Sequence, residues 1–205
     1  MNNNNLDTYK TIVSPGEETL LKEKKSKFYG YAFPISTVDE VKPILEKLKK
    51  KHHTACHVCY AWQIGVETIR YRANDDGEPN NSAGMPIYGQ IQSCDVTNIL
   101  VAIVRIFGGT KLGVGGLISA YRESAQLALK ASAIVERTIK QEFVLSFDYP
   151  IMDKVMRVIK QHQIEIVAQQ LEMNCSYIIS VRKQKATEIE SIFTSMQYIT
   201  IKRKE

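Results

Sequence analysis

The chain has 205 residues, of which 44% are hydrophobic and 24% charged, and its formal net charge is +5 with a pI near 8.9. This composition is typical of a folded globular protein with one sizeable domain or two small ones, and no apolar run reaches the ~20 residues that cross a membrane. The weak basic excess allows an acidic partner such as RNA but falls short of a strongly basic nucleic-acid-binding domain.

The N-terminal region predicts a short tail followed by edge strands. Residues 1–5 are rich in asparagine and are expected to be disordered, and they lack the apolar core of a signal peptide, so we expect a cytoplasmic protein. Residues 17–34 alternate loosely around the basic run KEKKSK, which predicts one or two strands at a sheet edge. The lysines are either solvated surface or, because aromatic residues follow them, a nucleic-acid-binding face.

A helix is predicted from Thr37, because Thr37-Val-Asp-Glu40 is a capping box and an apolar stripe follows it to a basic end at residues 49–51. Residues 52–64 then gather three of the four histidines and two of the four cysteines, and Cys56-x-x-Cys59 has a spacing that zinc sites use. The same segment alternates as a strand, on which positions three apart face opposite sides. Zinc binding and reduced, buried thiols are therefore both open interpretations, and strand geometry favours the thiols.

An acidic turn follows this strand, where Asp75, Asp76 and Glu78 lie close to Arg72. The Asp-Gly and Pro residues predict a turn, but carboxylates this close repel one another. We therefore expect them either to point into solvent or to have a task, such as binding a cation, accepting hydrogen bonds from arginines or acting as a base. Residues 86–94 predict a short helix.

The centre of the chain is a strand, a glycine loop and a helix between Val101 and Ala131. The run VAIVRIF, apolar except for Arg105, predicts a strand buried on both faces, and an amphipathic stripe predicts a helix beginning near Leu117. Lys111 lies in the loop between them. The glycines of this loop are Gly108, Gly109, Gly113, Gly115 and Gly116. Neither the Walker pattern nor the dinucleotide pattern fits, so an anion site at the helix N-terminus and a purely structural turn remain two interpretations.

The last third of the chain predicts a second domain. Its alternating and helical segments follow the order β-α-β-β-α-β, which is that of the ferredoxin-like split unit. We predict an α+β protein with domains at residues 1–138 and 139–205.

Three long motifs resemble the IMPACT family in its bacterial two-domain form. They are Arg72-Ala-Asn-Asp75-Asp76-Gly77-Glu78-Pro79, Ala83-Gly84-x-Pro86, and Arg105-x-Phe107-Gly108-Gly109-x-Lys111-Leu112-Gly113-x-Gly115-Gly116-Leu117. The resemblance implies an N-terminal α/β domain of the ribosomal-protein and elongation-factor-G domain IV superfold, and a C-terminal domain similar to the ferredoxin-like fifth domain of that factor. It also implies a link to translation, because eukaryotic members are regarded as regulators of translation control that act through protein partners. It implies no catalytic residue and no cofactor.

Three functions fit these observations. The first is a regulator that binds RNA, the ribosome or a translation-factor partner through a cleft at the glycine loop; the second is a Mg²⁺-dependent enzyme acting on a phosphorylated small molecule or other small substrate; the third is a protein-interaction module. No membrane partner is expected. The candidate ligand- or phosphate-binding residues are Arg72, Asp75, Asp76, Glu78, Arg105, Gly108, Gly109, Lys111, Gly113, Gly115, Gly116 and Arg122. We expect Asp75, Asp76, Glu78 and Lys111 to meet in one polar cleft at the end of the Val101 strand.

Overall fold

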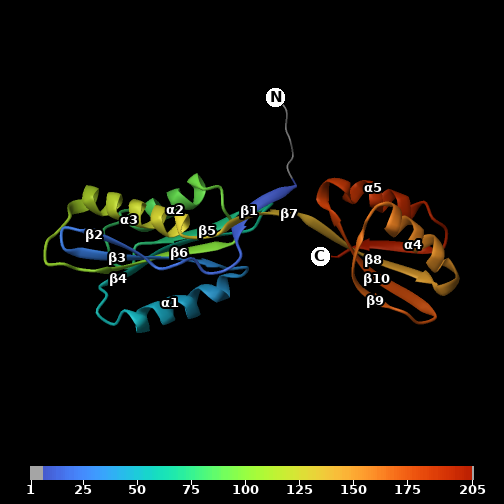
Figure 1. Ribbon diagram of the computed structural model, residues 1–205, viewed down its shortest axis with the longest axis horizontal. Coiled ribbons are helices and arrows are strands. Elements are labelled where there is room, and N and C mark those ends of the chain that lie inside the picture. Colours follow the sequence, from blue (N-terminus) through green and yellow to red (C-terminus); the bar gives the residue numbers. More distant parts are fainter. Residues whose placement is uncertain (1–6, 205) are drawn as a thin grey trace, which may run out of the picture. The chain divides into compact units, whose positions relative to one another are not determined.

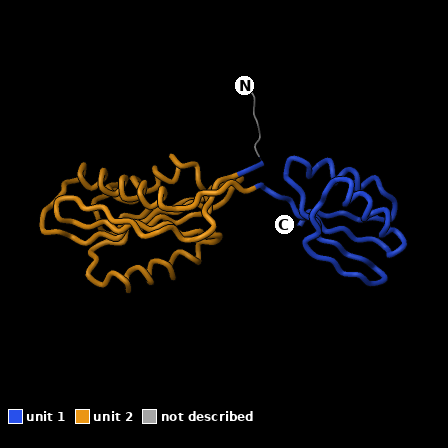
Figure 2. Tube along the Cα trace, viewed as in Figure 1, with its two compact units in different colours: residues 1–8, 138–205 blue, residues 9–137 orange. Residues whose placement is uncertain are grey.

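A computed structural model describes residues 7–204, so the predicted tail at residues 1–5 lies outside the described residues. The chain packs as two compact units, with residues 9–137 in unit 2 and residues 138–204, together with Asp7 and Thr8, in unit 1 (Figure 2). This division falls next to the boundary expected from the sequence. That each part folds independently stays a prediction.

Unit 2 is built on a five-stranded sheet whose neighbouring strands all run antiparallel. Its spatial order is β2 (Thr19–Glu23), β3 (Ser26–Pro34), β6 (Ile99–Ile106), β4 (His57–Ile64) and β5 (Arg70–Asn74). The central strand β6 is the apolar run predicted from the sequence, and seven of its eight residues are buried. It lacks the alternating pattern of a half-exposed strand because helices cover both faces of the sheet at β6.

Helices cover both faces of this sheet (Figure 1). The helices α2 (Gly84–Ser93) and α3 (Gly113–Lys130) pack side by side on one face, and α1 (Val41–Lys51) lies on the other. A single 3-10 turn, Val38–Glu40, precedes α1, and the Thr37 N–H donates to Glu40 Oε1 at 2.8 Å as the capping box predicts. The two-helix face holds the largest core cluster, whereas α1 covers smaller clusters that include Trp62.

Three strands were not predicted from the sequence. One is β5, whose residues were grouped with the acidic turn, and the others are β1 (Thr8–Ile12) and β7 (Ile134–Thr138), which form a separate two-stranded sheet. β1 and β7 are five residues long, and their sequences, TYKTI and IVERT, lack the apolar alternation that identifies a strand.

Unit 1 has the predicted β-α-β-β-α-β order. Its elements are β8 (Lys140–Asp148), α4 (Met152–Gln161), β9 (Glu165–Gln170), β10 (Asn174–Arg182), α5 (Lys183–Thr194) and β11 (Ile199–Arg203), with a 3-10 turn at Tyr149–Ile151. The sheet order is β11-β8-β10-β9 with antiparallel neighbours, and the core lies between this sheet and its two helices. The α+β class is thus observed, while the assignment of either unit to a particular superfold stays a prediction. None of the helices in residues 7–204 is long and apolar enough to span a membrane.

Candidate functional site

A cleft of about 510 Å³ lies where β6 ends and the glycine loop, residues 107–112, begins. Glu78 from the acidic turn (Asp75–Pro79), Arg105 from β6 and Lys111 from the glycine loop all line it, so the predicted convergence of turn and loop is present at these residues. The remaining lining residues are Cys56, His57, Pro79, Phe107, Leu112, Gly113, Val114 and Leu117. The lining is therefore largely apolar, in contrast to the polar cleft expected, and its charged side chains are Glu78, Arg105 and Lys111.

Arg105 and Glu78 form an ion pair in this wall. Arg105 Nη1 lies 2.6 Å from Glu78 Oε1, and the two side chains are 7% and 4% exposed. The guanidinium also lies 5.6 Å from the ring centres of Phe28 and Phe107. A buried arginine needs such partners, because removal of an isolated charge from water is costly. The buried Nε of Arg105 has no hydrogen-bond partner among the described residues.

A neutral hydroxyl and a thiol complete the surroundings of Glu78. The Tyr121 hydroxyl of α3 donates to Glu78 Oε1 at 2.8 Å, and the Cys59 thiol donates to the Tyr121 oxygen at 3.3 Å. Burial raises the pKa of both Cys59 and Tyr121 well above their ordinary values, because water no longer solvates the charged forms. Cys59 therefore stays a protonated thiol, which is a poor nucleophile, and Tyr121 stays a hydrogen-bond donor.

Asp75 does not point into the cleft but binds the start of α2. Its Oδ1 accepts from the backbone N–H groups of Ala83 and Gly84 at 2.9 and 2.8 Å, and its Oδ2 accepts from Asn81 at 2.9 Å. A carboxylate at a helix N-terminus satisfies free amides and interacts favourably with the helix dipole. The role of Asp75 is thus to hold α2 against the end of β5.

Asp76 links the turn to β4. The backbone N–H of Val58 donates to Asp76 Oδ2 at 2.7 Å, and Lys49 Nζ lies 3.5 Å from Asp76 Oδ1. The Asp76 carbonyl lies 2.7 Å from Nδ1 of His57. The positive φ angles at Asp76 (42°) and Gly77 (89°) make the tight turn that separates the three carboxylates. The repulsion expected from the sequence is avoided because each carboxylate has its own donors.

These bonds leave no cation site in the turn. Among residues 7–204, no three His, Cys, Asp or Glu side chains come close enough to hold a metal ion together. Cys56, in the bend before β4, is exposed, while Cys59 in β4 is buried.

The glycine loop differs from the sequence-based expectation at the start of its helix. α3 begins at Gly113, four residues before the predicted Leu117, so Gly115 and Gly116 lie in its first turn and do not have positive φ. Only Gly109 and Gly113 need the left-handed region, with φ of 86° and 74°. Neither Gly115 nor Gly116 is therefore needed for a backbone conformation that other residues avoid.

Each remaining glycine has a different environment. A Cβ on Gly108 would lie 2.0 Å from the Lys25 backbone, so packing requires this glycine. A Cβ on Gly116 would lie 3.2 Å from the Leu112 side chain. Gly115 has open space around the position of its missing Cβ, so neither packing nor backbone conformation explains why this residue is glycine.

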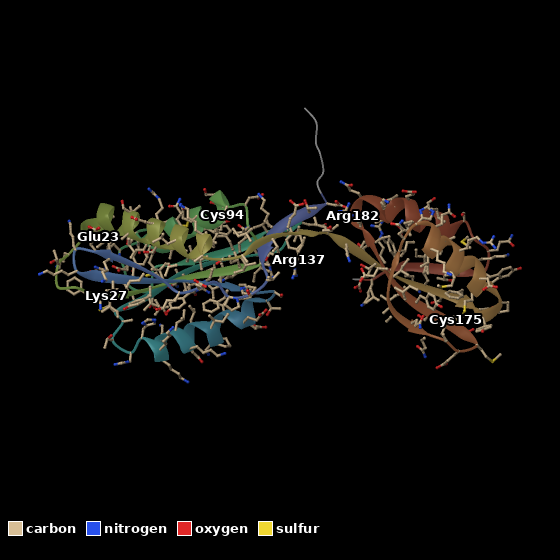
Figure 3. All side chains as sticks on the ribbon, viewed as in Figure 1. Glu23, Lys27, Cys94, Arg137, Cys175 and Arg182 are labelled. Carbon is tan, nitrogen blue, oxygen red and sulfur yellow. The ribbon has the colours of Figure 1, made fainter. Side chains whose placement is uncertain are left out.

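The basic hairpin of β2 and β3 lies directly against this loop. The Gly108 N–H donates to Ser26 Oγ at 3.2 Å, and Lys27 pairs in register with Ile106 at the end of β6. Figure 3 labels Glu23 and Lys27 at this end of unit 2. The exposed lysines of the hairpin are Lys22, Lys24, Lys25 and Lys27. About 80 residues separate this basic run from the glycine loop in the sequence. Only the pairing of β3 with β6 brings them together.

Of the twelve candidate residues, Glu78, Arg105, Lys111 and Gly113 line the cleft and the other eight do not. Arg72 lines a groove on the α1 face of the sheet, and Arg122 is exposed on α3 without lining the cleft. Conversely, sequence analysis missed Tyr121 and Phe107 as polar and aromatic parts of the site. The available signal for Tyr121 was that a buried tyrosine hydroxyl usually has a hydrogen-bond partner.

The sequence motifs behind this geometry match a known family. The family model of the Impact N-terminal domain matches residues 24–129, which is just over half of the chain. The chain belongs to the IMPACT family. It is 35% identical to the IMPACT family member YvyE of Bacillus subtilis over 158 residues, which cover 77% of this chain and 72% of that one. It is 31% identical to the family member YigZ of Escherichia coli, over 67% and 69% of the two chains.

Similarity to a eukaryotic member is confined to a smaller part of both chains. The protein IMPACT of Rattus norvegicus is 33% identical over 98 residues, which cover 45% of this chain and 30% of that one. A crystal structure described only as that of a hypothetical protein matches with a TM-score of 0.69 at 24% identity, covering 97% of this chain and 98% of that one. This last match supports the two-unit fold alone.

Proposed function

We propose that this IMPACT family member is a translation-associated regulatory protein that binds RNA of the translation apparatus through the cleft beside the glycine loop. The link to translation is what the family resemblance implies. The choice of RNA rests on the chemistry of the cleft.

The observation that carries this proposal is the unoccupied set of donors in the cleft. No side chain caps the N-terminus of α3, and its first turn contains no acidic residue. Free amides at a helix N-terminus favour an anion, and Lys111 adds a positive charge beside them. Arg105, whose guanidinium is paired with Glu78, lines the same cleft. These donors suit the oxygen atoms of a phosphate group.

Two features extend the surface beyond a single phosphate. Phe107 is 43% exposed at the cleft, where a nucleotide base can stack on its ring. The lysines of the β2–β3 hairpin lie next to the same loop, and a row of cations is suited to consecutive phosphates. Together they favour single-stranded or loop RNA, whose bases are free to stack.

The alternative of a Mg²⁺-dependent enzyme has less support. Asp75 and Asp76 are engaged by backbone amides, and Glu78 is paired with Arg105 and Tyr121. A Mg²⁺ ion bound there would have to replace bonds that hold α2, β4 and the cleft wall. We therefore propose no catalytic residue.

The test is fluorescence anisotropy with a labelled RNA hairpin that has a single-stranded loop, at 50 and 200 mM salt. Binding should weaken steeply with salt because bound phosphates release counterions. Lys111→Ala should reduce the slope of log affinity against log salt by about one unit. Lys130→Ala is the matched control, since Lys130 is an exposed lysine at the other end of α3 and should leave the slope unchanged.

Two results would contradict the proposal. The first is no binding at 50 mM salt, which would instead favour a protein-interaction module whose apolar contacts are Phe107 and Val114 at the cleft. The second is an equal salt slope for Lys111→Ala and Lys130→Ala, which would place RNA elsewhere on the molecule.

A further inference from the structure

The strand β5 is an open edge of the large sheet. Within the described residues, the backbone of Arg70–Asn74 pairs only with β4, and β5 is the last strand in the sheet order. On the face toward α2, Tyr71 stacks on Tyr88 with ring centres 4.2 Å apart but remains 53% exposed. An edge strand of this kind presents unpaired N–H and C=O groups to which another strand can bind.

A groove of about 380 Å³ runs beside this edge on the other face of the sheet. Its floor is formed by Tyr60 and Trp62 of β4, and α1 forms one side. α1 packs against β4 and β6 but does not cover β5 (Figure 1). The groove therefore offers a partly apolar floor directly alongside the free edge.

The charge around the groove is predominantly positive. Lys42, Lys49 and Arg72 line it together with a single acidic residue, Glu46. Arg70 is two residues before Arg72 on the same strand, so both side chains lie on one face of the sheet. Neither arginine forms a salt bridge with another described residue, and both are exposed.

We propose that β5 is a docking edge for an extended, acidic peptide segment of a partner protein, which adds a strand to the sheet beside the groove. Main-chain hydrogen bonds to β5 give the segment its strand conformation. Acidic side chains at alternate positions lie on the face of Arg70 and Arg72, beside the groove that Trp62 lines, and the apolar side chains between them lie on the other face, beside Tyr71. This surface lies on the opposite face of the sheet from the α2–α3 helices and does not depend on the RNA proposal.

The positive charge of Arg70 and Arg72 favours some partners at this edge over others. A second copy of the chain that paired through β5 would place arginines opposite arginines, which is unfavourable. RNA would complement the charge but would leave the strand-forming groups of β5 unpaired. An acidic peptide satisfies both the charge and the main-chain groups.

The single tryptophan of the chain provides the measurement, because Trp62 lies in the groove. The whole protein is titrated with a capped nine-residue peptide of alternating glutamate and valine, and Trp62 emission is followed. Arg72→Glu should weaken binding about tenfold. The matched control Arg157→Glu, which makes the same change at an exposed residue of α4, should leave binding unchanged.

A second peptide tests the strand pairing itself. The same sequence with methylated backbone nitrogens at alternate residues keeps its charge but cannot form a full ladder, and it should bind at least about tenfold more weakly. The proposal is overturned if Trp62 emission does not saturate, or if the methylated peptide binds equally well. It is also overturned if a single-stranded RNA of the same charge binds more tightly and is weakened by Arg72→Glu, which would make the groove a nucleic-acid site.

Discussion

The helices α2 and α3 lie side by side on one face of the same sheet, yet their N-termini are treated differently. The amides at the start of α2 are bound by the carboxylate of Asp75, which comes from the turn before it. The amides at the start of α3 have no capping side chain and open onto the cleft with Lys111. The first N-terminus is completed by the chain itself, whereas the second is available to an external anion.

This contrast separates the two motifs that are most prominent in the sequence. The acidic turn (Asp75–Pro79) consists of groups with internal partners, so its variants should change the free energy of unfolding. The glycine loop and the first turn of α3 contain groups without such partners, so some of their variants should change binding while the fold is kept. The predictions below test this difference, beginning with the largest expected effect.

Glu78→Ala should destabilise the protein by about 3–5 kcal/mol, because it leaves Arg105 buried without its carboxylate. Urea unfolding followed by circular dichroism measures this loss. The double variant Glu78→Leu with Arg105→Met removes both charges and should recover most of the stability. A loss below about 1 kcal/mol for Glu78→Ala would show that the acidic turn is not required for the fold.

Asp75→Ala should cost about 2 kcal/mol, since it leaves the capped amides of Asn81, Ala83 and Gly84 without their acceptor. Glu123→Ala is the control, because Glu123 is exposed in the middle of α3 and its loss should change stability by less than about 0.5 kcal/mol. Equal unfolding midpoints for Asp75→Ala and Glu123→Ala would mean that the start of α2 does not need this cap.

Gly115→Ala should have the opposite sign. It should raise stability by up to about 1 kcal/mol, because alanine favours the helix and its Cβ meets no atom within 4 Å. The same Cβ should hinder an anion at the N-terminus of α3 and weaken RNA binding about tenfold, as expected for one lost charge-assisted hydrogen bond. Gly109→Ala, at a positive φ, should instead lower stability by about 1 kcal/mol. A Gly115→Ala variant that binds RNA as tightly as the wild type would remove the α3 N-terminus from the proposed site.

The smallest expected effect comes from a hydrogen-bonded cluster of Glu18, Tyr31, Lys51 and His52 in unit 2. Its titrating groups, Glu18 and His52, are less buried than Glu78 and Arg105. The Tyr31 hydroxyl donates to Glu18 and lies 2.6 Å from His52 Nε2, and Lys51 Nζ lies 2.6 Å from Glu18 Oε2. The hydrogen bond from Lys51 lowers the pKa of Glu18, and partial burial lowers the pKa of His52. Both groups therefore bind protons more readily in the unfolded chain, so stability should fall as the pH drops below 6.5, the ordinary value for histidine, and again below 4.5 for Glu18.

Solvent screening should keep each of these contributions below about 1 kcal/mol. Unfolding curves at pH 7.5 and 5.5 measure the histidine contribution, and His52→Gln should reduce their difference. A difference that is unchanged in His52→Gln would assign the pH dependence to other groups.

Local patterns in the sequence were enough to predict most of the secondary-structure elements. The run around Val101 predicted the buried central strand, Thr37 and Glu40 predicted the start of the first helix, and the alternating patterns after Ile139 predicted the β-α-β-β-α-β order. These features depend on the side-chain period of a single element or on contacts between near neighbours in the chain, which a sequence contains directly. The long motifs likewise identified the family, which the family model and the relatives confirm.

Which groups are available for binding depends on contacts that form only in the folded protein. The partner of Asp76 is an amide of β4, and the partner of Glu78 is an arginine 27 residues away, so neither is apparent from spacing. Arg72 was grouped with the cleft because it is close in sequence to the acidic turn, but the pairing of β5 with β4 places it on the opposite face. A charge is satisfied by whatever donor the folded chain brings within hydrogen-bond distance, and strand pairing and helix packing, which are not local, determine that donor.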